Sequence, residues 1–325
     1  MRVLLTGGTG FIGSRVLPHL LERGHQVNLV VNRTPPPVAE GPSVKYHRCD
    51  LTDPVNFRGA GFKADAAINV AGQLRVPGLP DAHYWKVHYE ATKHVLEECT
   101  RFSLRRLVQV STTGVYGVTG RTPVAEEGPI RPSDIYEKTK WEGERYAREY
   151  CSDGRLELAI VRPGLVYGPG DRHLLGLYKA IQRGYFRLIG DGENLVHPIF
   201  IEDLADGILA CLERPEAREG TYNMVGERPV SFRRFCEAIA AALGRPLPAR
   251  TLPRAAAMAV GLFLEGVRAV TRVAVPLTRD RVAFMTSDRA YDPSRAEREI
   301  GFRAATGLDE GMRRTVAWYR EKGWL

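Results

Sequence analysis

The feature that most constrains this chain is a glycine-rich turn close to its first residue. The apolar run Val3–Leu5 leads into Thr6-Gly7-Gly8-Thr9-Gly10-Phe11-Ile12-Gly13, and a helical spacing of apolar residues then continues to Arg23. Glycines between a strand and a helix permit a tight turn, let the backbone approach a pyrophosphate and allow close helix–strand packing. Because a helix N-terminus also attracts anions, the turn predicts a dinucleotide-binding site, although a glycine cluster alone also fits a simple turn. The expected cofactor contacts are Gly7, Thr9, Gly10, Phe11, Ile12 and Gly13.

The rhythm of the first half of the chain indicates an α/β fold. Short runs rich in β-branched residues alternate with helical patterns; the runs are Val3–Leu5, Val27–Val31, Val44–Tyr46, Ala66–Val70, Leu107–Val110 and Leu158–Val161. Strands that alternate with helices of about 10–15 residues are typical of βαβ units. We therefore expect a Rossmann doubly wound parallel sheet with helices on both faces.

The composition of the chain changes after Pro163, where glycine and proline become frequent. One further strand pattern, Val196–Ile201, is expected to return to the main sheet. These features predict a dinucleotide-binding Rossmann domain over residues 1–170, to which residues 195–225 return. Residues 171–194 and 226–325 are expected to form a smaller, mostly helical C-terminal substrate-binding domain.

The composition excludes several classes of protein. The 325 residues are 44% hydrophobic and 26% charged, which is typical of a globular chain and not of a disordered one. The longest apolar stretch, Ala255–Leu264, is too short to span a bilayer. The five cysteines lie far apart without a CxxC pair, which favours free thiols in a reducing, cytoplasmic compartment. Since Met1–Thr6 already fits a strand, no signal peptide is expected.

The net charge of +8 is concentrated toward the C-terminus. From Arg245 onward, 15 Lys and Arg residues stand against 9 Asp and Glu residues. A nucleic-acid face, a face for anionic substrates or membrane surfaces, and a solvated surface all fit such an excess. Acidic residues interleave with the arginines, as in Arg279-Asp280-Arg281, which favours the solvated surface. With no nucleic-acid module and no liganding spacing of histidines, neither nucleic acid nor a metal is expected.

The end of the second expected strand indicates which nicotinamide cofactor the site prefers. NAD-binding sites place Asp or Glu there to bind the ribose 2′-hydroxyl, whereas this chain has Asn32 followed by Arg33. A guanidinium without that carboxylate suits a 2′-phosphate, so NADP(H) is favoured over NAD(H). The alternative is that Arg33 is an ordinary surface arginine. Asp50 and Leu51, after the third strand, are candidates for contacting the adenine, although Asp50 also fits a helix N-cap.

Two Tyr-xxx-Lys spacings occur, Tyr89/Lys93 and Tyr136/Lys140. The first pair lies inside a long helical pattern with no hydroxyl-bearing strand end just before it. The second pair follows a strand that ends in Ser111-Thr112-Thr113. Because α/β sheets bind ligands at the carboxyl ends of their strands, Tyr136 and Lys140 are the candidate reactive pair.

The chemistry of hydride transfer explains why such a set is needed. Oxidising an alcohol requires a base for the hydroxyl proton, and lowering a tyrosine pKa from about 10 by ~3 units needs roughly 4 kcal/mol. Lys140 lies one helical turn after Tyr136 and is expected to supply much of this while holding the nicotinamide ribose. Thr112 is expected to hydrogen-bond the reacting oxygen. The alternative is a half-buried amphipathic tyrosine beside a strand-end cap.

With these residues assembled, the chain resembles the extended short-chain dehydrogenase/reductase superfamily, the NAD(P)-dependent epimerase/dehydratase group. Further matching segments are Asn69-Val70-Ala71-Gly72, Ser111–Gly117, Arg162–Asp171, Phe200–Ala205 and Gly220–Asn223. The resemblance implies that Thr112, Tyr136 and Lys140 are catalytic. It also places Val70, Ala71, Gly72, Pro163 and Gly164 beside the cofactor, and implies a homodimer formed through helices at residues 81–102 and 134–152.

The chain departs from the nucleotide-sugar members of this group at substrate positions. Leu165 stands where they usually carry Asn, and Leu195-Val196-His197 where an arginine holds the substrate pyrophosphate. Thr113-Gly114 replaces the Asp-Glu of 4,6-dehydratases, and His88 stands where Asn is frequent.

The C-terminal segments point to other branches of the group. Leu277–Asp292 and Trp318–Arg320 resemble 3β-hydroxysteroid dehydrogenases and dihydroflavonol reductases. The apolar stretch Ala255–Leu264 fits either the lining of an apolar substrate pocket or a helix packed in the core of the smaller domain.

Three functional hypotheses follow. The leading one is an NADP(H)-dependent oxidoreductase that interconverts a secondary alcohol and a ketone on a fairly apolar small molecule, with Tyr136 as acid/base. The second is a nucleotide-sugar epimerase, which keeps its NAD bound between half-reactions. The third is a non-catalytic NADP(H) sensor, and the set Thr112, Tyr136 and Lys140 argues against it because a sensor needs no acid/base.

Overall fold

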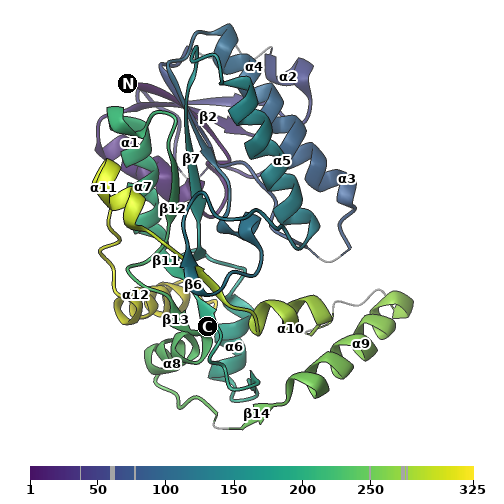
Figure 1. The fold of residues 1–325 in the computed structure, drawn as a ribbon. Coiled ribbons are helices and arrows are strands. Elements are labelled where there is room, and N and C mark those ends of the chain that lie inside the picture. The colour runs from purple at the N-terminus through teal and green to yellow at the C-terminus, as the bar shows by residue number, and fades with distance from the viewer. Residues whose placement is uncertain (37, 59–62, 77, 249, 272–274, 276) are drawn as a thin grey trace.

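A seven-stranded sheet forms the centre of the N-terminal part of the molecule (Figure 1). The computed structural model describes residues 1–325 except 37, 59–62, 77, 249, 272–274 and 276. The strands lie in the order β12-β7-β5-β4-β1-β2-β3, and each neighbouring pair is parallel. Their bounds are β1 (Arg2–Thr6), β2 (Gln26–Val31), β3 (Val44–Arg48), β4 (Ala66–Asn69), β5 (Arg106–Val110), β7 (Glu157–Pro163) and β12 (Thr221–Met224).

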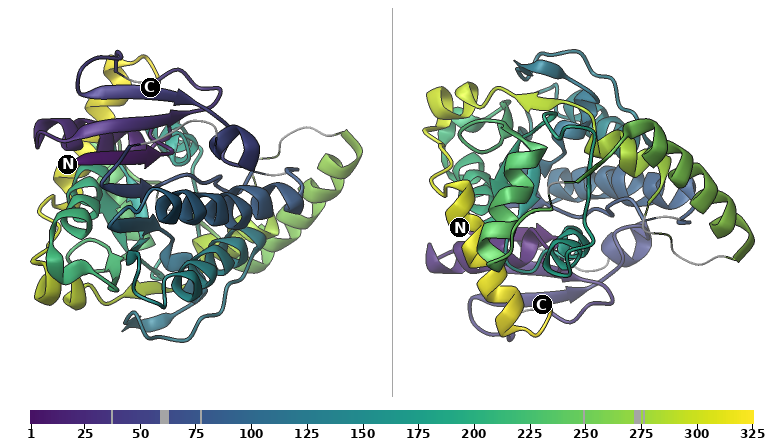
Figure 2. Two further views of the ribbon diagram at one scale, coloured as in Figure 1. Left: turned by 90° about the horizontal axis from the view of Figure 1, so that it is seen from above. Right: turned by 90° about the horizontal axis from the view of Figure 1, so that it is seen from below.

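Helices cover both faces of this sheet, which confirms the predicted Rossmann architecture (Figures 1 and 2). On one face lie α1 (Gly13–Glu22) and α7 (Ile201–Glu213), whose apolar side chains share a core with the sheet, for example Val16 with Ile208. On the other face lie α2 (Pro54–Arg58), α4 (Ala91–Arg101) and α5 (Ile135–Tyr150). Helices thus cover both faces of the sheet, which explains why central strands such as β1, β2 and β4 are mostly apolar.

The strand order reverses between β1 and β4, and this creates the crevice where α/β sheets bind ligands. The two loops that leave these strands touch at their bases. A Cβ on Gly7 would lie 2.6 Å from the backbone nitrogen of Ala71, and Gly7 has a φ of +68°. Only glycine combines this backbone conformation with so close an approach.

The expected return of Val196–Ile201 to the main sheet is wrong. This segment divides into β10 (Leu195–Val196) and β11 (Pro198–Phe200), and α7 begins at Ile201. β11 pairs with β8 (Leu165–Tyr167), and β10 pairs with β13 (Val230–Ser231), both in small separate sheets. The position beside β7 is occupied instead by β12, so no edge is open there.

The C-terminal residues build most of a second, largely helical core. It contains side chains of α6 (Leu175–Gln182), α8 (Phe232–Leu243) and α12 (Leu308–Glu321), such as Tyr178, Phe235 and Met312. The remaining short elements are β6 (Gly120–Val124), β9 (Leu188–Ile189), β14 (Thr251–Leu252), β15 (Arg289–Tyr291), α11 (Ser294–Ile300) and 3₁₀ turns at Thr113–Tyr116 and Pro215–Ala217.

Two helices beside that core form what we call the arm, residues 254–271 and 279–285, and Met285 packs against the core. They are α9 (Arg254–Thr271) and α10 (Arg279–Met285). Both views in Figure 2 show α9 extending beyond the outline of the rest of the molecule. The helices touch where the backbone of Thr278 and Arg279 lies about 3 Å from the position of a Cβ on Gly261.

A π-helical turn interrupts the long helix predicted at residues 81–101. Here α3 (Asp81–Tyr84) continues into a π turn over Trp85–Glu90 and then into α4. The backbone N–H of Ala91 donates to the carbonyl of Lys86, five residues earlier. The buried residue of this turn is His88, so the irregularity lies at the candidate site described next.

Candidate active site

The glycine turn is built to bring backbone N–H groups close to a ligand. A Cβ on Gly13 would lie 2.3 Å from the carbonyl oxygen of Gly7, and one on Gly8 would lie 2.2 Å from Leu29 Cδ1. At Gly10 a Cβ would meet only the Gly7 oxygen, at 3.2 Å, so this position faces open space. Helix α1 has no acidic residue in its first turn to compete for its positive end. The residues present therefore fit a dinucleotide pyrophosphate.

The structure brings the three residues expected at the adenine-ribose end together. Asn32 and Arg33 follow β2 and are exposed, while Asp50 follows β3. Burial favours a higher pKa for the Asp50 carboxyl, but hydrogen bonds from Thr52 and Asn32 and the charge of Arg33 outweigh it and lower the pKa. Asp50 therefore stays ionised beside Arg33. Leu51 accepts a hydrogen bond on its carbonyl from His94 Nδ1 at 2.7 Å, so its backbone is already engaged by α4.

The loop after β4 passes directly over the candidate catalytic lysine. Val70 and Ala71 are half-buried and Gly72 is exposed. A Cβ on Gly72 would lie 3.4 Å from Lys140 Nζ and 3.6 Å from His88 Nε2. The loop therefore lies in van der Waals reach of both side chains.

Tyr136 and Thr112 face each other across the carboxyl end of β5. Thr112 caps the 3₁₀ turn, where its Oγ1 accepts a hydrogen bond from the Gly114 N–H at 3.0 Å. Tyr136 is the second residue of α5, which Asp134 begins by accepting a hydrogen bond from the Glu137 N–H. Burial raises the pKa of Tyr136 to about 12, although the hydrogen bond with Thr112 opposes this. Tyr136 is therefore protonated and ready to act as a proton donor.

Lys140 lies one turn further along α5, but it does not lower the pKa of Tyr136 as expected. Its Nζ donates a 2.7 Å hydrogen bond to the carbonyl of Val110, the last residue of β5. Burial lowers the pKa of Lys140 to about 8, and Glu144 opposes this. The Lys140 ammonium is thus buried and points at the end of β5, and burial makes it easier to deprotonate than an exposed lysine.

Two further residues of the site carried weaker sequence signals. His88 was visible as a departure from the usual Asn, and the structure shows how it is used. Its Nε2 accepts from the Gln73 N–H at 3.0 Å, so its Nδ1 carries the hydrogen and donates to Thr139 Oγ1 at 2.8 Å. Its ring also meets that of Tyr136 edge-on, with centroids 5.3 Å apart. Burial and the charge of Lys140 lower the pKa of His88 to about 2, so it stays neutral.

The second missed residue is Glu144, one turn beyond Lys140. It forms a fully buried ion pair with Arg162 of β7, whose Nε donates to Glu144 Oε2 at 3.1 Å. Glu144 follows Lys140 by four residues, and this spacing places both side chains on the same face of a helix. The sequence could therefore have indicated an acidic neighbour for Lys140. Arg162 also donates to Tyr116, which in turn donates to Asn223 at 2.9 Å.

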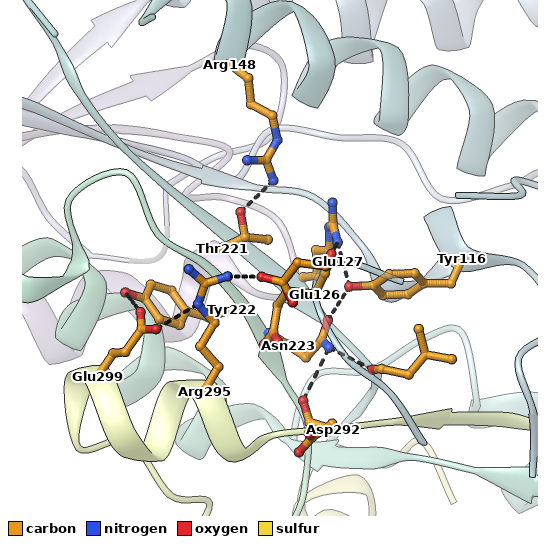
Figure 3. A network of polar contacts seen from close by, with 12 residues as sticks. Tyr116, Glu126, Glu127, Arg148, Thr221, Tyr222, Asn223, Asp292, Arg295 and Glu299 are labelled. Atoms are coloured by element: carbon orange, nitrogen blue, oxygen red, sulfur yellow. Dashed lines mark hydrogen bonds and ion pairs between the residues drawn. The ribbon is translucent and has the colours of Figure 1, made fainter. Parts of the chain in front are cut away.

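Asn223 of β12 is the centre of the polar network in Figure 3. Its side chain donates to the carbonyl oxygens of Val124 and Asp292, at 3.1 and 3.3 Å. Around it, Arg295 pairs with Glu127 and Glu299, and Tyr222 donates to Glu299 (Figure 3). The network fastens β15 and α11 to the edge of the sheet beside the site.

The end of β7 completes the expected set. Pro163 is buried and its carbonyl accepts a 3.0 Å hydrogen bond from Thr113 Oγ1. A Cβ on Gly164 would lie 2.4 Å from the carbonyl of His197, so glycine is required there by packing.

Other residues singled out in the sequence lie elsewhere or are engaged structurally. Tyr89 and Lys93 lie on the π turn and α4 against Tyr146, with the Lys93 ammonium 5.4 Å from the Tyr89 ring centroid. His197 is buried, its Nε2 donates to the Gly226 carbonyl at 2.9 Å, and burial lowers its pKa to about 4. Neutral His197 therefore supplies no positive charge for a substrate pyrophosphate.

Three further observations concern the part of the chain that the structure describes. All five cysteines are buried free thiols. Within the described residues, no group of three or more His, Cys, Asp and Glu side chains could hold a metal ion. No helix in the described ranges is both long and apolar enough to cross a bilayer.

Sequence comparison decides the family. Residues 3–225 match the NAD dependent epimerase/dehydratase family. This chain belongs to that family. It is therefore an enzyme of the extended short-chain dehydrogenase/reductase type that works with a nicotinamide dinucleotide.

The relatives divide between reductases and sugar-modifying enzymes. The chain is 29% identical to a 2-alkyl-3-oxoalkanoate reductase of Stenotrophomonas maltophilia, covering 98% of this chain and 99% of the relative. It is 27% identical to the mouse (Mus musculus) sterol-4-alpha-carboxylate 3-dehydrogenase, decarboxylating, covering 95% and 88%. The structure of a Thermus thermophilus UDP-glucose 4-epimerase complex with NAD superimposes with a TM-score of 0.78, at 26% identity over 98% of this chain and 99% of that one.

Proposed function

We propose that this enzyme is an NADP(H)-dependent oxidoreductase that interconverts a ketone and a secondary alcohol on a fairly apolar small molecule. The observation that carries the proposal is the pairing of protonated Tyr136 with Thr112 at the carboxyl end of β5, with Lys140 beside them. A hydroxyl donor held at this position is what carbonyl reduction requires.

The proposed roles follow from the contacts. In the reducing direction the Tyr136 hydroxyl gives its proton to the substrate oxygen, which Thr112 holds within reach by a hydrogen bond. A nicotinamide bound in the crevice would supply the hydride. Lys140, whose Nζ donates to the Val110 carbonyl at the same strand end, is the residue that would hold the nicotinamide ribose. The oxidising direction returns the proton to Tyr136.

The preference for NADP(H) rests on Arg33. The guanidinium is exposed at the end of β2, and the residue before it is Asn32 and not a carboxylate. Asp50 lies nearby, but its oxygens already accept hydrogen bonds from Thr52 and Asn32. Arg33 is therefore available to a ribose 2′-phosphate, as are Gly7, Gly10 and Gly13 to the pyrophosphate.

The proposed substrate class rests on two observations. The described substrate side lacks groups that bind a nucleotide sugar, and several relatives act on apolar substrates. Leu165 and neutral His197 provide neither the amide nor the cation that a nucleotide sugar needs. The 3-oxoalkanoate and sterol-carboxylate enzymes named above share nearly the full length of this chain. We propose that residues 171–194 and 226–325 form the substrate side, and that two chains associate through α4 and α5.

The second candidate is a nucleotide-sugar epimerase, which the 26% identity to the Thermus thermophilus UDP-glucose 4-epimerase favours. In that case Tyr136 would accept the proton of a sugar hydroxyl, bound NAD would be the hydride acceptor, and the cofactor would remain bound. A non-catalytic sensor is disfavoured by the Thr112, Tyr136 and Lys140 set.

The deciding experiment is a fluorescence titration of the purified protein with NADPH and NADH, with mass spectrometry of any cofactor that co-purifies. We expect NADPH to bind more tightly, little retained cofactor, and a loss of about tenfold or more in NADPH affinity for Arg33→Ala with NADH unaffected. The matched control is Arg155→Ala, an exposed arginine that pairs with Asp153. Tightly retained NAD(H) would overturn the cofactor assignment and make the epimerase the better function.

A further inference from the structure

Helix α9 exposes its apolar side to solvent, contrary to the usual arrangement of a surface helix. Between residues 255 and 267 every exposed position is an apolar or small residue; these are Ala255, Ala259, Val260, Leu262, Phe263, Gly266 and Val267. Leu262 is 56% exposed and Phe263 70%. A surface helix normally places charged residues on such a face.

The opposite side of α9 is the one that packs against the protein. Ala257 is fully buried with Ile189 and Val282, and Gly261 lies against the start of α10. The single acidic residue of the helix, Glu265, is held by Arg279 through a 2.8 Å ion pair. The exposed arc is therefore a fixed surface whose orientation the packing of the arm determines.

Arginines are frequent in the sequence on either side of this helix. From residue 245 to residue 281 the sequence has seven arginines against two acidic residues, Glu265 and Asp280. An apolar helix face flanked by arginines is the pattern of a helix that lies in the interface of an anionic bilayer. Two copies of this chain placed arm to arm would instead bring two strongly basic segments together, which costs free energy.

We propose that α9 docks this protein on an anionic lipid bilayer, with Leu262 and Phe263 entering the interface and the flanking arginines on the headgroups. The helix lies in the plane of the membrane and does not cross it, in agreement with the absence of a spanning helix among the described residues. This inference goes beyond the proposed function and does not rest on it.

Docking would also orient the substrate side of the enzyme. Arg268 Nη2 lies 3.2 Å from the position of a Cβ on Gly78, in the loop that follows β4. The same loop exposes Leu74 and Val76. The arm therefore reaches the segment that leaves the cofactor crevice, so an apolar substrate dissolved in the bilayer would have a short path to the site.

The test is sedimentation of the full chain with vesicles of equal parts phosphatidylglycerol and phosphatidylcholine, against vesicles of phosphatidylcholine alone. We expect binding to the anionic vesicles, weakened by salt, and a fall of about tenfold or more in the double variant L262D/F263D. The matched control is V55D/V118D, which changes two equally exposed apolar residues outside the arm. Thermal melting and NADPH binding of both variants should equal those of the parent.

Two measurements can overturn the proposal. The proposal is wrong if the parent protein does not bind anionic vesicles. It is also wrong if L262D/F263D binds them as well as the parent does. Sedimentation velocity without lipid tests the other occupant, because a change of oligomeric state in L262D/F263D but not in V55D/V118D would assign the face to a second copy. A dye attached at Phe263→Cys should shift to the blue with anionic vesicles, which the five buried native thiols would not disturb.

Discussion

Helices α1 and α9 carry similar alternations of apolar residues, yet the structure uses them in opposite ways. The apolar residues of α1, such as Val16, Leu17 and Leu20, are fully buried against the sheet and α7. Those of α9, such as Leu262 and Phe263, face solvent. The difference shows that an apolar period establishes a helix with an apolar face, while the topology decides whether that face has a partner. Pairs of residues of the same type allow this contrast to be tested. In most pairs one residue lies near the carboxyl edge of the sheet and the other lies on the arm or at the molecular surface.

The largest expected effect comes from the two Tyr-xxx-Lys pairs. Tyr136→Phe removes the only hydroxyl proton donor that faces Thr112 among the described residues, so kcat should fall about 10²–10⁴-fold on any ketone substrate. Tyr89→Phe changes the same residue type in the same spacing, away from the crevice, and should leave kcat unaltered. Steady-state NADPH oxidation measures both. Equal kinetics for the two variants would remove Tyr136 from the chemistry.

The second comparison concerns two ion pairs. Glu144→Gln leaves Arg162 charged and buried without its partner, so the free energy of unfolding should fall by about 3–5 kcal/mol. Glu265→Gln breaks the half-exposed pair with Arg279 on the arm and should cost less than about 1 kcal/mol. Urea denaturation distinguishes the two values. Similar small losses would show that Arg162 is solvated in solution.

The third comparison uses two helical glycines. Gly13→Ala places a Cβ 2.3 Å from the Gly7 carbonyl, so it should weaken NADPH binding and destabilise the fold by about 1–3 kcal/mol. Gly266→Ala on α9 meets nothing within 4 Å and should stabilise the protein by about 0.5–1 kcal/mol. Calorimetric melting and NADPH titration give both answers. A stabilised Gly13→Ala variant with normal affinity would contradict the packing of the turn.

The last expected effect is a pH dependence with opposite signs at two histidines. Burial holds the pKa of His88 at about 2, so below pH about 6.5 the unfolded chain binds a proton that the folded chain refuses. Stability then falls on acidification by up to about 1.4 kcal/mol per pH unit from this residue. Urea denaturation at pH 7 and pH 5 should show a smaller loss for His88→Asn than for the parent.

His19 provides the contrast on the outer surface of α1. Its hydrogen bond to Glu202, together with the nearby Asp206, raises its pKa. It therefore contributes stability that is present below its unfolded pKa and is lost as the pH rises through its folded pKa. His19→Gln should make the acid-induced loss steeper, the reverse of His88→Asn, and an equal change in both variants would rule out these environments.

The sheet was predictable from sequence because its residues are buried on both faces. The six strand patterns from Val3 to Val161 correspond to β1, β2, β3, β4, β5 and β7. The seventh strand, β12, was not recognised because Thr221–Met224 mixes polar and apolar residues. Asn223 in this strand can be buried because residues of the network in Figure 3 form hydrogen bonds with it. These partners are distant in the sequence, so no local pattern predicts them.

The sequence proposed a set of residues for the site, but it could not indicate their electrostatics. The motifs named Thr112, Tyr136 and Lys140, and the structure brings them to one strand end. The pKa of Tyr136 and that of Lys140 depend mainly on burial, and that of Lys140 also on Glu144, which the fold supplies. The sequence likewise could not predict the exposure of α9. A helix that lines a pocket, a helix packed in a core and a helix exposed to solvent can all have the same apolar pattern.

The π turn at Trp85–Glu90 has a consequence for how this site tolerates insertions and deletions. A single residue corresponds to about 100° of rotation around a helix, and the π turn accommodates one residue more than α-helical pairing would. Deleting Val87 would let an unbroken α-helix form, but it would swing Asp81–Tyr84 about 100° around the axis relative to α4. The segment Asp81–Tyr84 is therefore in phase with α4 only because of one additional residue in the turn that carries His88 to the proposed catalytic residue Tyr136. Chain length here is thus as constrained as residue identity.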